Sequence, residues 1–599
     1  MKKLILLQTI ILFSFIEIKA QTTETVIIDI QGVDIADSLI KPHMLGVIAG
    51  PNPLDPTETT PDLTSLLQDI GVTTIRNNDY YDDRLDMEQM FYCGTLPVTD
   101  STPNYPDWNC DPLDTTNYNW TQSDQQFSLY QAGNFIPFLR LGNEYGMIVR
   151  PHDYNGPRSA EENNWIQAAK MVTSHYINFG GNTNALGGYL DIWTEWPNTT
   201  FWDRSNAEFN SFWQRAYDSL KLSFPNLKIG GPGLIPSITL LQLAPGIASP
   251  TLFLFLNNLK TNNTKPDWIG YHVFTNNLDD YYNATLNLRN YLDATGPYSS
   301  LAADWGGSGI NSFFHGVEII CDAWMCSKYD TNGNMLPNST KDSIFNKQWG
   351  GAINMGAFII FQQTDVERAY KFRAGEASDP NANVLNGYHN MGGPALFYGD
   401  SAETYKPQAY SFKLCSKMQS EFNKKLISSV YAIASGGTKV WSLAGQNTSG
   451  EKAIIVSNNS PNTIQLSLQL NGVALSTNSY SFINQYTVTD SNNGQTPLAW
   501  SNGSFTLSPY TANLITMKNT AVGINESNIS KHEISLYPNP SNETLTFSET
   551  LNSIEVFNIF GQLVMSKIIS AKSISTLELS DGFYFIHANN ANLKFIVKH

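Results

Sequence analysis

The segment YLDIWTEWPN at residues 189–198, followed by AEFNSFWQRAYDSLKLS at 207–223 and LKIGGPG at 227–233, decides the fold of this chain. The first and last pieces are short apolar runs that end in polar or glycine-rich residues, which is typical of buried strands. The middle piece repeats apolar residues at the spacing of a helix. The segment therefore predicts one strand–helix–strand unit of an α/β fold.

The same alternation continues on both sides of this unit, between residues 40 and 420. Eight short apolar runs predict strands at 43–48, 73–78, 135–141, 189–196, 227–231, 268–274, 300–305 and 357–362. Segments with helical spacing lie between them, as at 161–179 and 311–329. Eight strand-then-helix units predict a (β/α)8 TIM barrel. An open, doubly wound sheet is the alternative, although no Gly-rich nucleotide-binding loop follows any of these runs.

The regions outside the barrel differ from it in pattern. Two lysines precede an apolar run at 4–16 that is too short to span a bilayer, which predicts a cleaved signal peptide and no transmembrane anchor. After residue 424, short alternating runs between Asn, Gly and Ser turns predict an accessory β-sandwich. The predicted parts are a signal peptide (1–21), a barrel (22–424), a β-sandwich (425–517), a linker (518–532) and a small β unit (533–599).

The overall composition narrows the class of partner. Of the 599 residues, 12% are aromatic and 15% are charged, and the net charge at pH 7 is −17. The aromatic content argues against a disordered chain, and the acidic balance disfavours nucleic acid and anionic membranes as partners. The composition suits an extracellular protein that binds neutral polar ligands.

Export would permit disulfide bonds among the five cysteines. Cys93 with Cys110, and Cys321 with Cys326, are candidate pairs, although four cysteines allow three pairings. Cys415 is then expected to be a buried thiol. The cysteine spacings do not match a zinc site.

Barrel enzymes carry their catalytic side chains at the carboxyl ends of the strands. Glu195 ends the fourth predicted strand between Trp193 and Trp196, and partial desolvation by the indoles would favour the neutral carboxyl of a general acid. Asp304 ends the seventh predicted strand. Two carboxyls facing each other across a barrel predict glycosidase chemistry, with Glu144 as a rival for the second position.

The run from Ile192 to Gly233 resembles glycoside hydrolase family 39 and its clan A relatives, through Ile-Trp-Thr-Glu-Trp-Pro-Asn, a Phe-Trp pair and Gly-Gly-Pro. The resemblance implies that Glu195 is the acid/base residue and that Asp304 is the nucleophile of a retaining mechanism. It also implies that Arg76 and His272 line the sugar subsite at the cleaved bond.

Two departures from the family pattern bear on these roles. Thr194 stands where the family has an Asn that contacts the sugar 2-hydroxyl, which points to an unusual sugar, such as one substituted at O2. Asp304 stands where the family has Glu, and the shorter side chain widens the gap between the carboxyls. Inversion therefore stays open as the outcome.

Other side chains near strand ends are predicted to bind substrate. Four aromatic residues would stack on sugar rings: Trp193, Trp196, Tyr271 and Trp305. After the last predicted strand, Arg368 and Arg373, with Lys371 between them, would form a positive lip for a sulfated or otherwise anionic glycan. The alternative is a loop in which nearby acidic residues pair with these cations.

Residues 533–599 contain ISLYPNPS at 534–541, IEVFNIFG at 554–561 and LSDGFYF at 579–585. These motifs resemble the type A C-terminal sorting domain of the type IX secretion system. The resemblance implies export across the outer membrane by that machinery, followed by release or attachment at the cell surface. An Ig-like binding module is the alternative.

Together these features predict a secreted, monomeric glycoside hydrolase that acts on a polysaccharide or oligosaccharide, with a sulfated or anionic algal glycan as the finer expectation. Neither a cofactor nor a metal is expected, because the Asp/Asn-rich loops at 330–334 and 379–383 complete no EF-hand. A non-catalytic glycan-binding protein at the cell surface is the main alternative, and a polysaccharide lyase is a further one.

Overall fold

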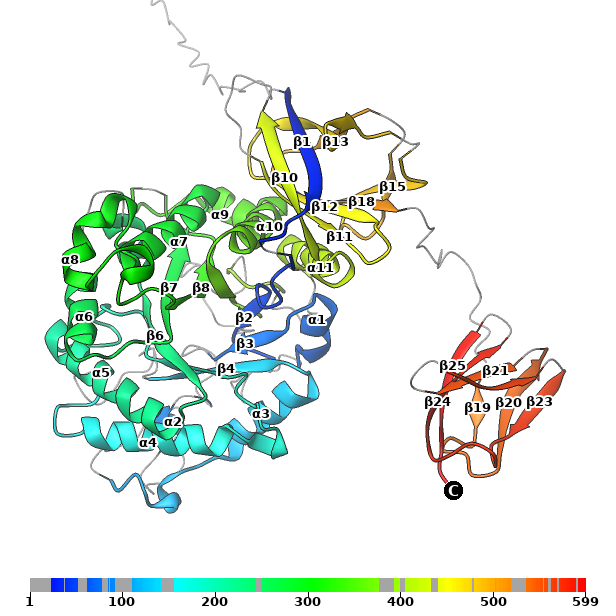
Figure 1. Ribbon diagram of the computed structural model, residues 1–599, viewed down its shortest axis with the longest axis horizontal. Coiled ribbons are helices and arrows are strands. Elements are labelled where there is room, and N and C mark those ends of the chain that lie inside the picture. The colour runs from blue at the N-terminus through cyan, green and yellow to red at the C-terminus, as the bar shows by residue number, and fades with distance from the viewer. Residues whose placement is uncertain are drawn as a thin grey trace, which may run out of the picture. The chain divides into compact units, whose positions relative to one another are not determined.

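The computed structural model (Figure 1) forms two compact units, Met1–Ala521 and Val522–His599, and each is described by itself. The residues described are 23–36, 38–51, 62–77, 85, 87–91, 110–142, 156–243, 249–330, 332–375, 393–398, 405–432, 440–476, 479–500, 503–518, 535–552, 554–558, 562–567, 570–588 and 591–599. The predicted signal peptide and most of the predicted linker lie outside these residues.

Eight parallel strands close into a barrel, so the predicted TIM-barrel fold is confirmed. In order they are β2 (Gly46–Ile48), β3 (Thr74–Arg76), β4 (Ile136–Leu141), β5 (Tyr189–Ile192), β6 (Lys228–Leu234), β7 (Trp268–Phe274), β8 (Glu318–Met325) and β9 (Val366–Phe372). Their residues are almost all buried, because helices cover the outer face and side chains fill the inside.

Helices surround the barrel (Figure 1). They are α1 (Thr64–Asp69), α2 (Met87–Met90), α3 (Thr121–Ala132), α4 (Glu162–Tyr176), α5 (Asn206–Ser223), α6 (Pro250–Thr261), α7 (Leu278–Leu292), α8 (Ala302–Trp305), α9 (Asn338–Phe345), α10 (Gln348–Gln363) and α11 (Pro407–Glu421). Helix α5 matches its prediction closely and begins with a capping box between Ser205 and Glu208.

The strands predicted at 300–305 and 357–362 are wrong. Residues 296–305 form a 3-10 turn and helix α8, in which Leu301 and Trp305 are buried one helical turn apart. Residues 357–362 belong to α10, which is buried nearly all round because it lies between the barrel and strands β12 (Lys452–Asn458) and β18 (Thr511–Lys518). A helix without a polar face has the sequence pattern of a buried strand.

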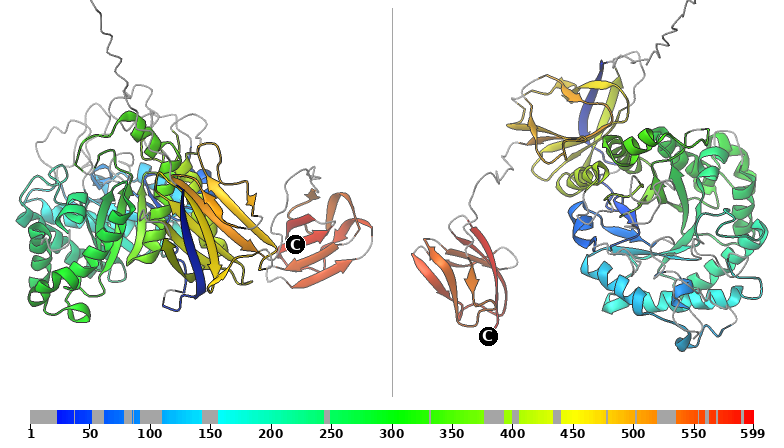
Figure 2. Two further views of the ribbon diagram at one scale, coloured as in Figure 1. Left: turned by 90° about the horizontal axis from the view of Figure 1, so that it is seen from above. Right: turned by 180° about the vertical axis from the view of Figure 1, so that it is seen from behind.

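The second part of this unit is a curled sheet of ten strands around its own apolar core. Its other strands are β1 (Thr23–Val33), β10 (Lys424–Ala432), β11 (Trp441–Gln446), β13 (Thr463–Leu470), β14 (Val473–Ala474), β15 (Phe482–Val488), β16 (Leu498–Ala499) and β17 (Phe505–Leu507). Strand β1 pairs with β10 and β13, so residues 23–33 belong to this sheet although they were assigned to the barrel. Figure 2 shows β1 in dark blue among these yellow strands.

The C-terminal unit is a small sandwich of two sheets with its own core. Its strands are β19 (Leu536–Tyr537), β20 (Thr544–Leu551), β21 (Ile554–Asn558), β22 (Leu563–Lys567), β23 (Ala571–Ser575), β24 (Gly582–Ala588) and β25 (Ala591–Val597). Phe583, Tyr584 and Phe585, from the last of the three motifs, lie at the start of β24. Successive side chains of a strand point to opposite faces, so Tyr584 is buried and its two neighbours are exposed.

The predictions for the cysteines are confirmed only in part. Cys110 is disulfide-bonded, and Cys93, its expected partner, lies outside the described residues. Cys321 and Cys326 are buried free thiols, so their predicted pairing is wrong, and Cys415 is a buried free thiol as expected. Among the described residues, no helix is both long and apolar enough to cross a membrane.

Candidate active site

The turn after β5 carries the first candidate catalytic group. Trp193 has φ of 77° and Glu195 has φ of 47°, a left-handed conformation that is unfavourable for large side chains. Strain of this kind concentrates at functional sites. The turn breaks the expected alternation: Trp193 packs against Trp165 and Phe212 in the helical layer, whereas Glu195 contacts His272 of β7.

Glu195 is held by two partners at the carboxyl end of the barrel. Its Oε1 lies 3.2 Å from Nδ1 of His272, and its Oε2 accepts a hydrogen bond of 3.0 Å from Nδ2 of Asn198. Its side chain is 22% exposed. Burial would raise the pKa of Glu195, but the hydrogen bonds from His272 and Asn198 outweigh burial and lower it.

Asp322 of β8 is a second carboxylate at the same place. Its Oδ2 lies 3.6 Å from Nε2 of His272 and 3.5 Å from Nη2 of Arg76, and its side chain has no exposed area. Burial opposes its ionisation, but His272 and Arg76 prevail and lower the pKa of Asp322. His272 therefore lies between two carboxylates.

The two carboxylates change the titration of His272 in turn. Burial alone would lower the pKa of His272, but Asp322 and Glu195 raise it to about 9. This raised pKa favours the protonated imidazole at neutral pH, with Nδ1 facing Glu195 and Nε2 facing Asp322. The ring of His272 links the candidate acid in the turn after β5 to the carboxylate on β8.

Arg76, the last residue of β3, connects Asp322 to a further buried carboxyl, that of Asp191. Its Nε and Nη2 donate to Oδ2 of Asp191 at 2.9 and 2.8 Å, and Nη2 lies 3.4 Å from Oγ1 of Thr194. Burial raises the pKa of Asp191, and Arg76 opposes that shift. The site thus contains a line of buried side chains in which acidic and basic groups alternate.

Two glycines leave room for the carboxylate of Asp322. A Cβ atom on Gly233 would lie 2.7 Å from Oδ2 of Asp322, and one on Gly270 would lie 2.8 Å from the same oxygen. Both distances are shorter than van der Waals contact. Gly233 is part of the Gly-Gly-Pro-Gly motif, which therefore has a direct role in the shape of the site.

Asp304, the predicted second carboxylate, is not part of this cluster. It lies on α8 in the outer helical layer and is exposed. Asp322 was missed because the seventh strand was placed too early in the chain. The signal was present in EIICDAWM at 318–325, an apolar run interrupted by a single acidic residue after its start. The rival Glu144 lies outside the described residues.

The four aromatic residues predicted to stack on sugars are buried in the helical layer. Trp196 stacks on Phe209, Trp305 stacks on Phe253, and the hydroxyl of Tyr271 bonds to Thr285 of α7. Trp193 is buried as described above. All four side chains fill the space between strands and helices, so the structure does not bring them to Glu195.

The predicted positive lip is also buried. Arg368, Lys371 and Arg373 are 5%, 0% and 1% exposed, and they lie in or directly after β9 rather than in a loop. The guanidinium of Arg368 lies 3.9 Å from the ring centre of Tyr189, the first residue of β5. Arg368 is thus at the amino ends of the strands, and Arg373 alone follows the carboxyl end of β9.

The described part of the chain contains no group of three or more His, Cys, Asp or Glu side chains placed to hold a metal ion. Several segments that follow strand ends, at 52–61, 78–84, 143–155, 244–248 and 376–392, lie outside the described residues.

Two family models match the chain. Residues 108–294 match glycosyl hydrolases family 39, and residues 535–599 match the secretion system C-terminal sorting domain. No protein with a curated description matches the sequence.

Solved structures with a similar fold cover most of the chain. A glucosidase from Croceicoccus marinus has a TM-score of 0.56 at 15% identity, covering 84% of this chain and 100% of its own. A GH39 β-xylosidase from Caulobacter crescentus has a TM-score of 0.54 at 14% identity, covering 82% and 99%. The GH39 enzyme from Xanthomonas axonopodis pv. citri has a TM-score of 0.53 at 13% identity, covering 84% and 98%.

The first family match contains Glu195 and His272, and the second covers the C-terminal sandwich. Type IX sorting domains direct export to the cell surface or the medium. The chain is therefore a glycoside hydrolase that resembles family 39 and carries a C-terminal sorting domain for export.

Proposed function

We propose that this enzyme cleaves glycosidic bonds in an extracellular polysaccharide or oligosaccharide, with Glu195 as acid and base and Asp322 as the second carboxylate. The assignment rests on His272, whose two ring nitrogens face the two carboxyls. Asp322 replaces Asp304 in this role because it lies at the barrel mouth beside His272. Glycosidases of this type need two carboxyls on either side of the bond.

The proton for the leaving group is held by His272 and Glu195 together. At neutral pH this pair binds one proton, and the distance of 3.2 Å between Nδ1 and Oε1 allows it to move to the carboxyl. Glu195 then protonates the glycosidic oxygen as the bond to the anomeric carbon breaks. Asn198 keeps the carboxyl of Glu195 oriented through Oε2.

Asp322 forms the new bond in the first step. Its carboxylate oxygen attacks the anomeric carbon and gives a glycosyl ester. Glu195, now ionised, takes a proton from water, the water oxygen attacks the same carbon, and Asp322 leaves as carboxylate. Two displacements retain the configuration. Arg76 keeps Asp322 ionised in the resting enzyme.

The finer proposal, a sulfated or otherwise anionic algal glycan, has lost most of its support. Arg368 lies near the amino end of β9, and Arg373 follows the carboxyl end of that strand. Lys371, next to the carboxyl end, is fully buried and donates to the carbonyls of Phe372 and Pro394. A parallel screen of neutral and sulfated polysaccharides for released reducing ends tests this point. The enzyme is proposed to act as a monomer, without nucleic acid, cofactor or metal.

The test of the site compares Asp322→Asn with Asp304→Asn, which changes the same group on α8. We expect the first variant to lose at least about a thousandfold in turnover and the second to match the wild type. NMR of the first product formed should show the anomeric configuration of the substrate. Full activity of Asp322→Asn would contradict the assignment, and an inverted product would contradict its role as nucleophile.

A further inference from the structure

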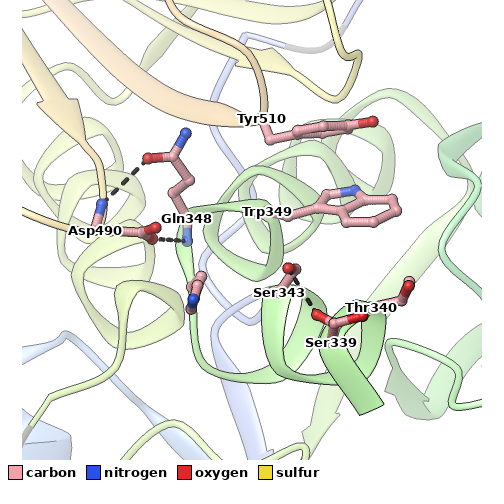
Figure 3. Close-up of a pocket in the computed structure, with 8 residues that line it drawn as sticks. Ser339, Thr340, Ser343, Gln348, Trp349, Asp490 and Tyr510 are labelled. Atoms are coloured by element: carbon pink, nitrogen blue, oxygen red, sulfur yellow. Dashed lines mark hydrogen bonds between the residues drawn. The ribbon is translucent and has the colours of Figure 1, made fainter. Parts of the chain in front are cut away.

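A hollow of about 400 Å³ lies where the barrel helices meet the ten-stranded sheet (Figure 3). Such a volume is within the range of ligand pockets, roughly 300–1,000 Å³. Its lining comes from α9, the start of α10 and two loops of the sheet: Ser339, Thr340, Ser343, Lys347, Gln348, Trp349, Asp490 and Tyr510. None of these residues belongs to the site at Glu195.

The hollow has an aromatic side and a hydroxyl side. The rings of Trp349 and Tyr510 pack at a tilt, with their centres 4.5 Å apart and their planes at 31°. Figure 3 shows Tyr510 on one face of the indole, with the side chains of Thr340 and Ser343 on the other side. An apolar ring opposite several hydroxyls suits a ligand with one C–H face and many hydroxyl groups.

Hydrogen bonds fix the indole relative to the barrel strands. Nε1 of Trp349 donates to Oδ1 of Asn459 at 2.7 Å, and Nδ2 of Asn459 donates to the carbonyl of Asn276 at 3.2 Å. Asn276 follows the carboxyl end of β7 and exchanges hydrogen bonds with Ser327, which follows β8. The aromatic platform is therefore anchored to the ends of the two strands that carry His272 and Asp322.

The junction is also held at the start of α10. The backbone N–H of Gln348 donates to Oδ1 of Asp490 at 2.7 Å, and the Nε2 of Gln348 donates to the carbonyl of Pro509 at 2.7 Å. Lys347 pairs with Asp342 at 3.1 Å. The charged groups here have partners of opposite sign or bond to the helix terminus, so the hollow suits a neutral ligand.

We propose that this hollow binds a neutral sugar unit of the polysaccharide, away from the bond that is cleaved. In a (β/α)8 barrel each helix runs antiparallel to the strand before it, so the start of α10 faces the same side as the carboxyl ends of the strands. A polymer held there stays near the barrel mouth, which raises its effective concentration at the catalytic carboxyls. This role rests on the proposed function, but binding itself requires no cleavage.

Binding is tested in the Glu195→Gln background by affinity electrophoresis in gels that contain xylan, β-glucan or galactan. We compare Trp349→Ala with Phe482→Ala, which removes an exposed ring from the same sheet. Trp349→Ala should weaken retention by the best-bound polymer about tenfold, whereas Phe482→Ala should not change it. Equal retention of both variants, or no retention of the parent by any of these polymers, would overturn the proposal.

A second variant covers the case in which Trp349→Ala misfolds. Ser343→Arg leaves the stacked rings in place and fills the hollow from α9, so it should reduce retention to a similar extent. In the active enzyme, both variants should lower the ratio of polymer hydrolysis to aryl-glycoside hydrolysis. If Glu195→Gln proves fully active, the catalytic assignment is wrong. The retention measurements would still show whether the hollow binds a polysaccharide.

Discussion

The barrel mouth and the hollow beside α10 are both polar, but they differ in burial and charge. At the mouth, Asp191, Arg76, Asp322 and His272 are buried and form a line of alternating acidic and basic groups. The hollow instead presents two packed aromatic rings and three hydroxyls, of which Ser339 is exposed and the others are partly buried. Proton transfer needs fixed charges in a site with little water, whereas sugar binding needs an accessible apolar face.

Glu195→Gln should produce the largest effect. The amide cannot donate the proton, so turnover of unactivated substrates should fall by at least about a thousandfold. Aryl glycosides with acidic leaving groups need less protonation and should lose much less. Steady-state kinetics over a series of leaving groups measures this difference. A uniform loss across the series would contradict a role as general acid.

Asp191→Asn should show how much the ion pair between Asp191 and Arg76 at the barrel mouth contributes to the stability of the protein. Removing one partner of a buried ion pair costs about 3–5 kcal/mol, because Arg76 would keep its charge without its closest carboxylate. Urea unfolding measures this loss. Asp203→Asn is the matched control, since its pair with Arg158 is partly exposed and should contribute less than about 1 kcal/mol.

The pH profile should follow the proton shared by His272 and Glu195. The pKa of His272 is raised to about 9, so the pair holds its proton below that value and loses it as the pH rises through it. We expect kcat/KM to fall above pH 9. The stability gained by this raised pKa should be complete below the ordinary value of about 6.5 and lost toward pH 9.

His272→Gln tests whether His272 causes the fall in kcat/KM at high pH, which is the basic limb of the pH profile. Without the imidazolium, Glu195 alone must keep the proton, and the fall in kcat/KM should begin at a lower pH. A profile with the same basic limb as the wild type would show that another group carries the proton.

Gln348→Ala should have the smallest effect. It removes two hydrogen bonds between α10 and the sheet at a partly exposed position, with an expected cost of about 1 kcal/mol. Thermal unfolding should shift by a few degrees at most. If Gln348→Ala lost as much stability as Asp191→Asn, the junction between α10 and the sheet would be as sensitive to substitution as the barrel mouth.

Much of the site could be predicted from sequence where local pattern and motif agreed. Glu195, Arg76 and His272 end or nearly end strands whose short apolar runs are easily recognised. Asp322 could not be placed, because the strand at 300–305 was taken for the seventh. Leu301 and Trp305 are also compatible with a helical turn, and only packing against α6 and α7 decides between the two.

The aromatic residues and the cations illustrate a second limit. Trp193 and Trp196 do follow a strand, whereas Trp305 lies on α8. Even after a strand, the direction of each side chain depends on backbone angles such as φ of 77° at Trp193. Likewise, Arg368 lies near the start of β9 and Arg373 follows the end of that strand, so the two lie at opposite ends of the barrel. Residues only a few positions apart in the sequence can therefore lie at opposite ends of one strand.

By itself, the sequence determined six of the eight barrel strands, the export domain and the position of Glu195 directly after β5, because each depends on local periodicity or a contiguous motif. The tertiary structure alone decided which carboxylate faces Glu195, where the substrate-binding candidates point, and that β1 joins the distant sheet. These features depend on contacts between residues far apart in the chain. Local propensity does not encode such contacts, which appear only when the barrel closes and its helices pack.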